Sequence, residues 1–361
     1  MEQFRDIAPM LELMDRAAFC VKDGSILHVN EAAKRLMITP DTPLEALLST
    51  GAEEYAAFQG GCLYLTVQAA ARPWGASVTR MGEYDIFRLE EENDQAQLHT
   101  MALAARELRI PLNNIMSTAD QLFPIKQLQD DPAAREQAAR MNRGLFQLLR
   151  IVTNMSDAAR YNGDFEPRME TVNITALLDE IFRKVQHSLL ETGVTIHFSN
   201  NCDSVFSLAD SEMLERAVFN ILSNAVKFTP AGGCIDAKLT QRGKMLCLTV
   251  QDTGSGIPEE LRGNIHNRYR RSPNLEDSRH GLGLGMVLIR SAAAAHGGTV
   301  LIDHPNDTGT RITLTLAINQ HTGALLRSPV FRIDYAGERD HLLMELSQCL
   351  PLSLYDPEKI N

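Results

Sequence analysis

The amino-acid sequence predicts a multidomain α+β protein, because its patterning changes twice along the 361 residues. Short β-like runs and turns fill residues 8–92, an unbroken helical repeat fills 93–163, and mixed strands and helices fill 168–318. This length is typical of two or three folded units. The extension 319–361 holds one more strand-like run at 330–335 and a helix over about 340–350, and we expect this helix to pack on the third module.

The first module, residues 8–92, is predicted to be a small α+β fold. Two apolar runs flank Lys22-Asp23-Gly24-Ser25, and an Asp-Gly dipeptide between β-forming residues is typical of a hairpin turn. A helix is expected over 31–37. Further strands are expected at 62–67, 76–80 and 84–89.

The second module, residues 93–163, is predicted to be a helical hairpin. Apolar residues alternate spacings of three and four from Leu98 to Leu122, and again from Ala134 to Ala159. Asp131 before Pro132 is a typical N-cap of the second helix. Two such antiparallel helices cannot cover their own apolar seam, so we expect two copies to form a four-helix bundle. A monomeric hairpin that packs on another domain is the alternative.

The third module, residues 168–318, mixes helices with strands. The expected helices cover 174–191, 212–227 and 286–295. The expected strands cover 194–198, 234–239, 245–252, 299–303 and 311–317. Three clusters of polar residues and glycines lie within or beside these elements, and each suits one part of a bound nucleotide.

The first cluster lies on the predicted helix 212–227. Asn220, Asn224 and Lys227 are spaced at i, i+4 and i+7, so they share one helix face. Amide oxygens suit a hard cation such as Mg²⁺, and a lysine beside them can neutralise phosphate. This face is therefore a candidate site for phosphate together with a metal ion.

The second cluster, Asp252, Gly254 and Gly256, follows the predicted strand 245–252. A carboxylate can accept a hydrogen bond from an exocyclic amine, and glycines let the backbone approach a flat ring. This turn is therefore a candidate site for a nucleotide base.

The third cluster, Gly281, Gly283 and Gly285, opens the predicted helix 286–295. Free backbone N–H groups at the start of a helix can bind phosphate oxygens at the positive end of the helix dipole. Each cluster alone is a weak signal, whereas their order and spacing together are far more specific.

These clusters resemble the motifs of the sensor histidine kinases. Residues 220–229 are similar to their asparagine box, and 252–258 and 281–286 to their two glycine boxes. His296-Gly297-Gly298 stands where the family's His-Gly-Gly follows. The resemblance extends to all three modules: 8–92 resembles a PAS sensor, 93–163 the dimerisation and phosphotransfer helices, and 168–318 the α/β-sandwich catalytic domain that binds ATP.

The resemblance implies a role for each cluster, with ATP and Mg²⁺ as cofactors. By position, Asp252 would bind the adenine amine, and Lys227 would contact phosphate. Asn224, together with Asn220, would face Mg²⁺ and the phosphates. The glycines of the third cluster would cradle the triphosphate.

One departure concerns the phosphoacceptor. The family's segment reads His-Glu-Leu-Arg-Thr-Pro-Leu, whereas this chain has Arg106-Glu107-Leu108-Arg109-Ile110-Pro111-Leu112. A guanidinium stays protonated and offers no lone pair for attack. Glu107, the family's general base, is retained, and Ile110 replaces the residue that positions the dephosphorylating water. The resemblance therefore implies a signalling protein of the protein-histidine kinase class that does not phosphorylate itself at position 106.

Several alternatives stay open. His99 lies two helical turns before Arg106 on the same face and is an alternative acceptor. The ATP domain of this chain could also phosphorylate a partner's histidine in trans. A gyrase-like or chaperone-like ATPase is disfavoured, because such enzymes need a carboxylate where Asn220 stands. A scaffold that binds no nucleotide is the remaining alternative.

Composition and charge limit the partners. A net charge of −11 disfavours nucleic acid as a partner. We see no apolar run long enough to span a membrane, and the six cysteines are scattered without a Cys-x-x-Cys pair. We therefore expect a cytoplasmic protein. The helical hairpin predicts a homodimer, and the resemblance implies a response regulator or another histidine kinase as the partner. The ligand of the first module is not predicted.

Overall fold

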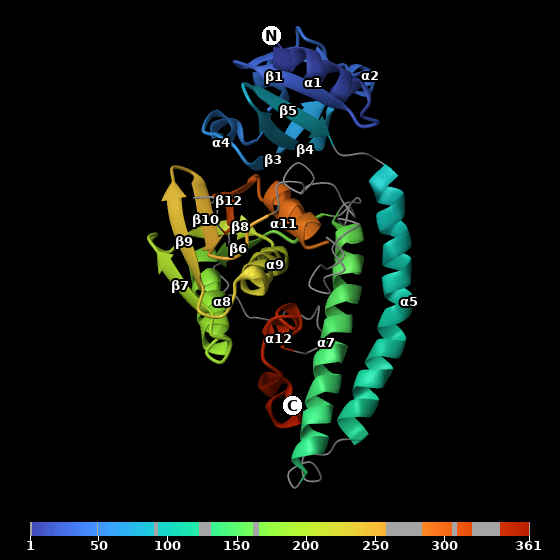
Figure 1. Ribbon diagram of the computed structural model, residues 1–361, viewed down its shortest axis with the longest axis vertical. Helices are drawn as coiled ribbons and strands as arrows, with labels where there is room; N and C mark the ends of the chain where they lie inside the picture. Colours follow the sequence, from blue (N-terminus) through green and yellow to red (C-terminus); the bar gives the residue numbers. More distant parts are fainter. Residues whose placement is uncertain are drawn as a thin grey trace.

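The structure is a computed structural model of the chain. It describes residues 2–48, 50–89, 93–122, 131–161, 166–257, 284–304, 309–319 and 340–360. Figure 1 shows a compact α+β body at one end, a pair of long helices along one side, and a second α+β body beside those helices. A mixed α+β architecture is therefore confirmed.

The first body contains one five-stranded sheet with short helices. Its strands are β1 (Ala18–Lys22), β2 (Ser25–Val29), β3 (Cys62–Ala69), β4 (Arg72–Met81) and β5 (Tyr84–Leu89). Its helices are α1 (Glu2–Glu12), α2 (Glu31–Arg35), α3 (Leu44–Leu47) and α4 (Ala52–Ala56). The predicted hairpin is confirmed, since β1 pairs with β2 and both Asp23 and Gly24 adopt the positive φ of a tight hairpin turn.

The two faces of this sheet pack against different helices. Phe19 and Val21 share a core with residues of α2 and α3, whereas Ala18 and Cys20 pack with Leu11 of α1. Successive side chains of a strand point to opposite faces, so β1 contributes to both cores.

The two predicted long helices are confirmed as α5 (Asn93–Leu122) and α7 (Pro132–Arg160), which lie side by side and antiparallel. Asp131 caps α7, because its carboxylate accepts hydrogen bonds from the N–H groups of Ala133 and Ala134. Within the predicted seam, Leu108 and Ile115 of α5 and Leu148 of α7 remain at least half exposed, at 50%, 54% and 51%. This chain alone leaves part of the apolar seam uncovered, and the four-helix bundle stays a prediction.

The second α+β body is a sheet covered by helices on one face. Its helices are α8 (Ile174–Ser188), α9 (Ser211–Phe228) and α11 (Leu284–Ala295). Its strands are β6 (Glu170–Asn173), β7 (Thr195–Asn200), β8 (Phe206–Ala209), β9 (Cys234–Arg242), β10 (Met245–Asp252), β11 (Val300–Asp303) and β12 (Arg311–Ala317). The main sheet runs β11-β12-β10-β9-β7, and β6 and β8, which the sequence patterns did not predict, form a separate pair.

The two sheets join into one sheet of ten strands. Edge strand β3 pairs antiparallel with edge strand β11, with Cys62 opposite Ile302 and Tyr64 opposite Val300. The junction leaves no room for a side chain at Gly61, because a Cβ there would lie closer than 3.0 Å to the Ile302 carbonyl oxygen. Arg290 of α11 lies over the Tyr64 ring at 4.9 Å. The first body is therefore docked directly on the second.

The segment 340–360 lies between α7 and α9 (Figure 1). It contains α12 (His341–Glu345), a 3₁₀ turn η2 (Leu352–Tyr355) and α13 (Pro357–Ile360). The expected helix over 340–350 is therefore shorter than predicted, and the segment packs on the hairpin as well as on the third module. The predicted strand at 330–335 lies outside the described residues.

The structure also addresses the sequence-based expectations for the cysteines and for membrane-spanning segments. All six cysteines are unpaired thiols. Within the described ranges, no helix is both long and apolar enough to cross a bilayer.

Candidate functional site

Helix α9 carries the first cluster. Asp210 caps this helix by accepting a hydrogen bond from the N–H of Met213 at 3.1 Å. The three polar residues follow at the expected spacing: Asn220 is 2% exposed, whereas Asn224 and Lys227 are partly buried. The Asn220 amide donates to the Arg216 carbonyl at 2.8 Å, which turns its oxygen Oδ1 away from the helix backbone.

Asp252 stands at the end of β10 and is largely buried. Its Oδ1 accepts hydrogen bonds from the N–H groups of Gly254 at 2.8 Å and Thr310 at 3.1 Å. Among the described residues, no donor bonds its second oxygen, Oδ2. Burial raises the pKa of the Asp252 carboxyl, and the two backbone N–H groups oppose that rise. The geometry leaves one acceptor oxygen for a ligand.

The glycines hold the three clusters in contact. A Cβ at Gly254 would lie closer than 3.0 Å to the Phe228 carbonyl oxygen, so the turn after β10 packs on the end of α9. A Cβ at Gly285 would lie 2.8 Å from Asn220 Oδ1, so the first turn of α11 packs on the middle of α9. Gly256 has a φ of 69°, which only glycine adopts readily. Gly281 and Gly283 lie outside the described residues.

His296 holds α11 against the start of α9. Its Nε2 accepts a hydrogen bond from the N–H of Asp210 at 2.9 Å, and its Nδ1 donates to the Ala292 carbonyl at 2.7 Å. Burial lowers the pKa of this imidazole, so the neutral ring is the form that fits. The N-cap of α9 and the end of α11 are therefore fixed to each other.

The donors on α9 fit a magnesium ion bound together with phosphate. Asn220 Oδ1 is a hard oxygen donor next to the N-terminal turn of α11. Mg²⁺ usually keeps several waters and takes ligands from substrate phosphates, so it needs few ligands from the protein itself. In the described part of the chain, no three His, Cys, Asp or Glu side chains gather as an independent metal site.

Three polar or charged residues that the sequence analysis did not single out border the site: Arg150, Glu345 and Gln348. Arg150 of α7 donates from Nη2 to Asn220 Oδ1 at 3.4 Å, and Glu345 of α12 pairs with Arg150 Nε at 3.2 Å. Lys227 Nζ donates to the side chain of Gln348 at 3.3 Å. No local pattern marks these residues, because their partners lie 70 to 195 positions away along the sequence.

The predicted phosphoacceptor position lies on α5. Arg106, Glu107 and Ile110 are exposed there. His99 lies on the same helix, seven residues earlier. Met101 packs against the cluster of Ala158, Leu284, Val287 and Leu288, so this part of α5 lies close to the first turn of α11.

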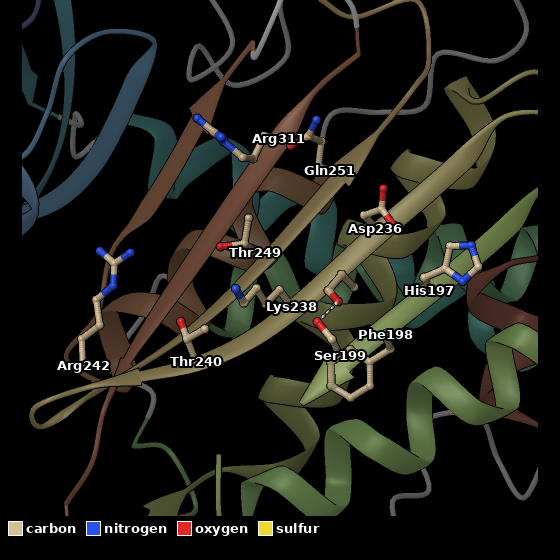
Figure 2. A pocket seen from close by; sticks show the side chains of 11 residues that line it. His197, Phe198, Ser199, Asp236, Lys238, Thr240, Arg242, Thr249, Gln251 and Arg311 are labelled. Atoms are coloured by element: carbon tan, nitrogen blue, oxygen red, sulfur yellow. Dashed lines mark hydrogen bonds between the residues drawn. The ribbon is translucent and has the colours of Figure 1, made fainter. Parts of the chain in front are cut away.

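A surface depression of about 470 Å³ lies elsewhere, on the sheet face that the helices leave open (Figure 2). Polar side chains of β7, β9, β10 and β12 line it, including Asp236, Lys238 and Arg311. It contains none of the predicted site residues, and we do not assign it to the nucleotide.

Comparisons with known proteins identify the domain that carries the clusters. Residues 209–320 match the family model described as Histidine kinase-, DNA gyrase B-, and HSP90-like ATPase. This span contains α9, β10 and α11. Residues 209–320, which make up most of the predicted third module, therefore match a histidine kinase-like ATPase domain.

The curated relatives include proteins named as histidine or sensory kinases. The chain is 29% identical to Hybrid signal transduction histidine kinase D of Dictyostelium discoideum, over 68% of this chain and 17% of that protein. It is 26% identical to Adaptive-response sensory kinase SasA of Gloeothece citriformis, over 68% and 65%. It is 31% identical to an uncharacterized sensor-like histidine kinase of Rhizobium meliloti, over 63% and 44%. The chain thus spans less than two thirds of the length of each.

Two solved structures are similar as well. Full-length ShkA in complex with AMPPNP is 23% identical, over 62% of this chain and 46% of that chain, with a TM-score of 0.48. Histidine kinase ThkA in complex with the response regulator protein TrrA is 16% identical, over 86% and 98%, with a TM-score of 0.43.

Proposed function

We propose that this chain is a two-component signalling protein that binds ATP and Mg²⁺. Two findings support this: residues 209–320 match a histidine kinase-like ATPase domain, and the relatives support a sensor histidine kinase family. One observation carries the proposal: Gly254 packs on the end of α9, and Gly285 packs on Asn220 in its middle. Three clusters distant in sequence are thereby joined around one helix.

Each cluster supplies a different part of the site. Asp252 accepts the exocyclic amine of adenine at Oδ2, because Oδ1 is already bonded to two backbone N–H groups. Asn220 and Asn224 face the metal and phosphates, and Lys227 contributes positive charge. Magnesium, when bound, neutralises phosphate charge. The first turn of α11 offers backbone N–H groups to the phosphates.

The chain is deficient in phosphorylating itself at position 106. The guanidinium of Arg106 offers no lone pair, and the exposed Glu107 therefore has no imidazole proton to accept. Its output would be exerted on a response regulator or on a partner histidine kinase, whose histidine this ATP domain could phosphorylate in trans.

The remaining modules supply input and assembly. Residues 8–92 serve as a PAS-like sensor, 93–163 as dimerisation helices, 168–318 as the catalytic domain and 319–361 as an extension. The exposed Leu108, Ile115 and Leu148 favour a homodimer through the helices. The pairing of β3 with β11 favours a second route for the signal, from the sensor directly into the ATP domain.

Calorimetric titration with ATP and Mg²⁺ tests the proposal. Asp252→Asn keeps an acceptor at Oδ1 but places an amide N–H₂ where the adenine amine donates. We expect at least about tenfold weaker binding, because a hydrogen bond to a charged group contributes about 1.5–3 kcal/mol. The matched control is Asp236→Asn, an exposed carboxylate on the opposite sheet face. Equal binding by both variants, or no binding by the wild type at millimolar ATP, refutes the proposal.

A second candidate function is self-phosphorylation at His99. The observation that favours it is the packing of Met101, two residues later, against the cluster formed with the start of α11. Incubation with γ-labelled ATP distinguishes the candidates. Acid-labile label that disappears in His99→Ala supports this acceptor, and label that survives the substitution eliminates it.

A further inference from the structure

The 340–360 segment is buried between the ATPase domain and the hairpin. Met344, Leu346 and Tyr355 are fully buried within the large core that α7 and α9 share. The Tyr355 ring meets the Phe146 ring of α7 edge-on at 5.7 Å, and the Asn142 amide donates to the Tyr355 carbonyl at 3.2 Å. The segment therefore adds a third element to the contact between α7 and α9, which also meet directly through Asp157 and Arg216.

A buried ionic cluster forms part of this junction. Glu345 of α12 is 0% exposed and pairs with Arg150 of α7 and with Arg216 of α9, at 3.2 and 3.6 Å. Arg216 also pairs with Asp157 of α7 at 2.6 Å. Two guanidinium groups are thus balanced by two carboxylates that come from different elements. Loss of one carboxylate charge leaves buried positive charge uncompensated, which is unfavourable in a protein interior.

The same junction reaches the nucleotide face of α9. Glu345 holds Arg150, whose Nη2 lies 3.4 Å from Asn220 Oδ1. A guanidinium at this distance repels a metal ion that approaches the same oxygen. Gln348, three residues after Glu345, accepts a hydrogen bond from Lys227 Nζ at 3.3 Å. Two of the three polar residues of this face are therefore engaged by α7 or by the segment.

We propose that residues 340–360 form an autoinhibitory segment, which holds α9 against α7 and keeps Asn220 and Lys227 in contacts that compete with Mg²⁺ and phosphate. This inference rests on the proposed function. If nucleotide binds only molecules in which the segment has left α9, its apparent affinity is the intrinsic affinity multiplied by the fraction of such molecules. Because this coupling is reciprocal, bound nucleotide shifts the equilibrium toward release of the segment by the same factor by which release strengthens nucleotide binding.

The test compares ATP binding by the full-length wild type with that of two variants. Glu345→Gln removes the buried charge, and Gln348→Ala removes the Lys227 contact at an exposed position that cannot disturb the core. We expect each to lower the Kd for ATP and Mg²⁺ by about fivefold or more, the lower end of typical coupling energies. The control is Glu358→Gln, an exposed carboxylate of the same segment that pairs with Arg135.

Hydrogen exchange supplies a second readout. We expect saturating ATP and Mg²⁺ to lower the amide protection of residues 341–355 in the wild type. Unchanged affinity in both variants, or unchanged protection on nucleotide addition, overturns the proposal and leaves the segment a structural support. If the wild type and all variants fail to bind ATP, the proposed function fails, and the autoinhibitory role fails with it. If the wild type and Glu358→Gln bind ATP with equal affinity and Glu345→Gln and Gln348→Ala bind it more tightly, both proposals are supported.

Discussion

Gly61 offers a direct test of the junction between the sheet of the first body (β1 to β5) and the sheet of the second, at strand β11. This residue has a φ of 86°, and a Cβ there would overlap the Ile302 carbonyl oxygen. In Gly61→Ala the left-handed backbone costs about 1–2 kcal/mol. Relief of the overlap must move β3 away from β11, where three residue pairs meet. Each lost hydrogen bond costs about 0.5–1.5 kcal/mol, so we expect a total destabilisation of about 2–5 kcal/mol.

Two other glycines separate the two contributions. Gly24 also has positive φ, at 75°, but a Cβ there would meet no atom within 4 Å, so Gly24→Ala reports the backbone cost alone. A Cβ at Gly60, the neighbour of Gly61, would also meet no atom within 4 Å. Gly60→Ala therefore measures the effect of adding a methyl group beside the junction without a clash. Urea unfolding gives the free energies, and hydrogen exchange gives the protection of amides 300–302. If Gly61→Ala destabilises no more than Gly24→Ala and β11 keeps its protection, the close approach is not structurally important.

Three further predictions concern the acceptor, the pH dependence and the dimer. Arg106→His places a lone pair beside Glu107, so we expect acid-labile label from ATP in this variant and none in Arg106→Gln; an unlabelled histidine variant that still binds ATP would contradict this. Burial lowers the pKa of His296 below its ordinary 6.5, so the native state binds fewer protons than the unfolded chain. The free energy of unfolding should therefore decrease below about pH 6.5, by at most about 1.4 kcal/mol per pH unit, and urea titrations should show a smaller decrease in His296→Gln. Ile115 is 54% exposed on the predicted dimer face, so Ile115→Lys should convert a dimer into a monomer in analytical ultracentrifugation, and a wild-type monomer refutes the bundle.

Local interactions explain which elements could be predicted from the sequence. The hairpin at Asp23 and Gly24 follows from turn chemistry, and the start of α7 follows from the Asp131 cap, both of which involve neighbouring residues. The order of the three clusters likewise indicated α9, β10 and α11 as the elements of the site. The contact between Asn220 and Gly285 could not be derived in the same way, because 65 positions separate them and only the packing of α11 on α9 brings them together.

The sequence also did not predict which charged side chains are buried or which residues pair with them. No sequence feature distinguishes three charged residues, Arg150, Arg216 and Glu345, from exposed charged residues of helices. All three are nevertheless buried in one ionic cluster. Charged side chains are expected at the surface unless they are paired, and the sequence does not contain the pairing. The partners come from α7, α9 and α12, so only the assembled structure determines which charges are compensated.

The sequence by itself determined the chemistry of the candidate site: amides and a lysine on one helix face, a carboxylate before glycines, and Arg106 at the predicted phosphoacceptor position. These features depend on residue type and short spacing. Only the tertiary structure decided that β3 joins β11 and that residues 340–360 pack on both α9 and α7. Sheet edges and buried faces carry no local signal for their partner, because the free energy of such contacts exists only after distant segments have met.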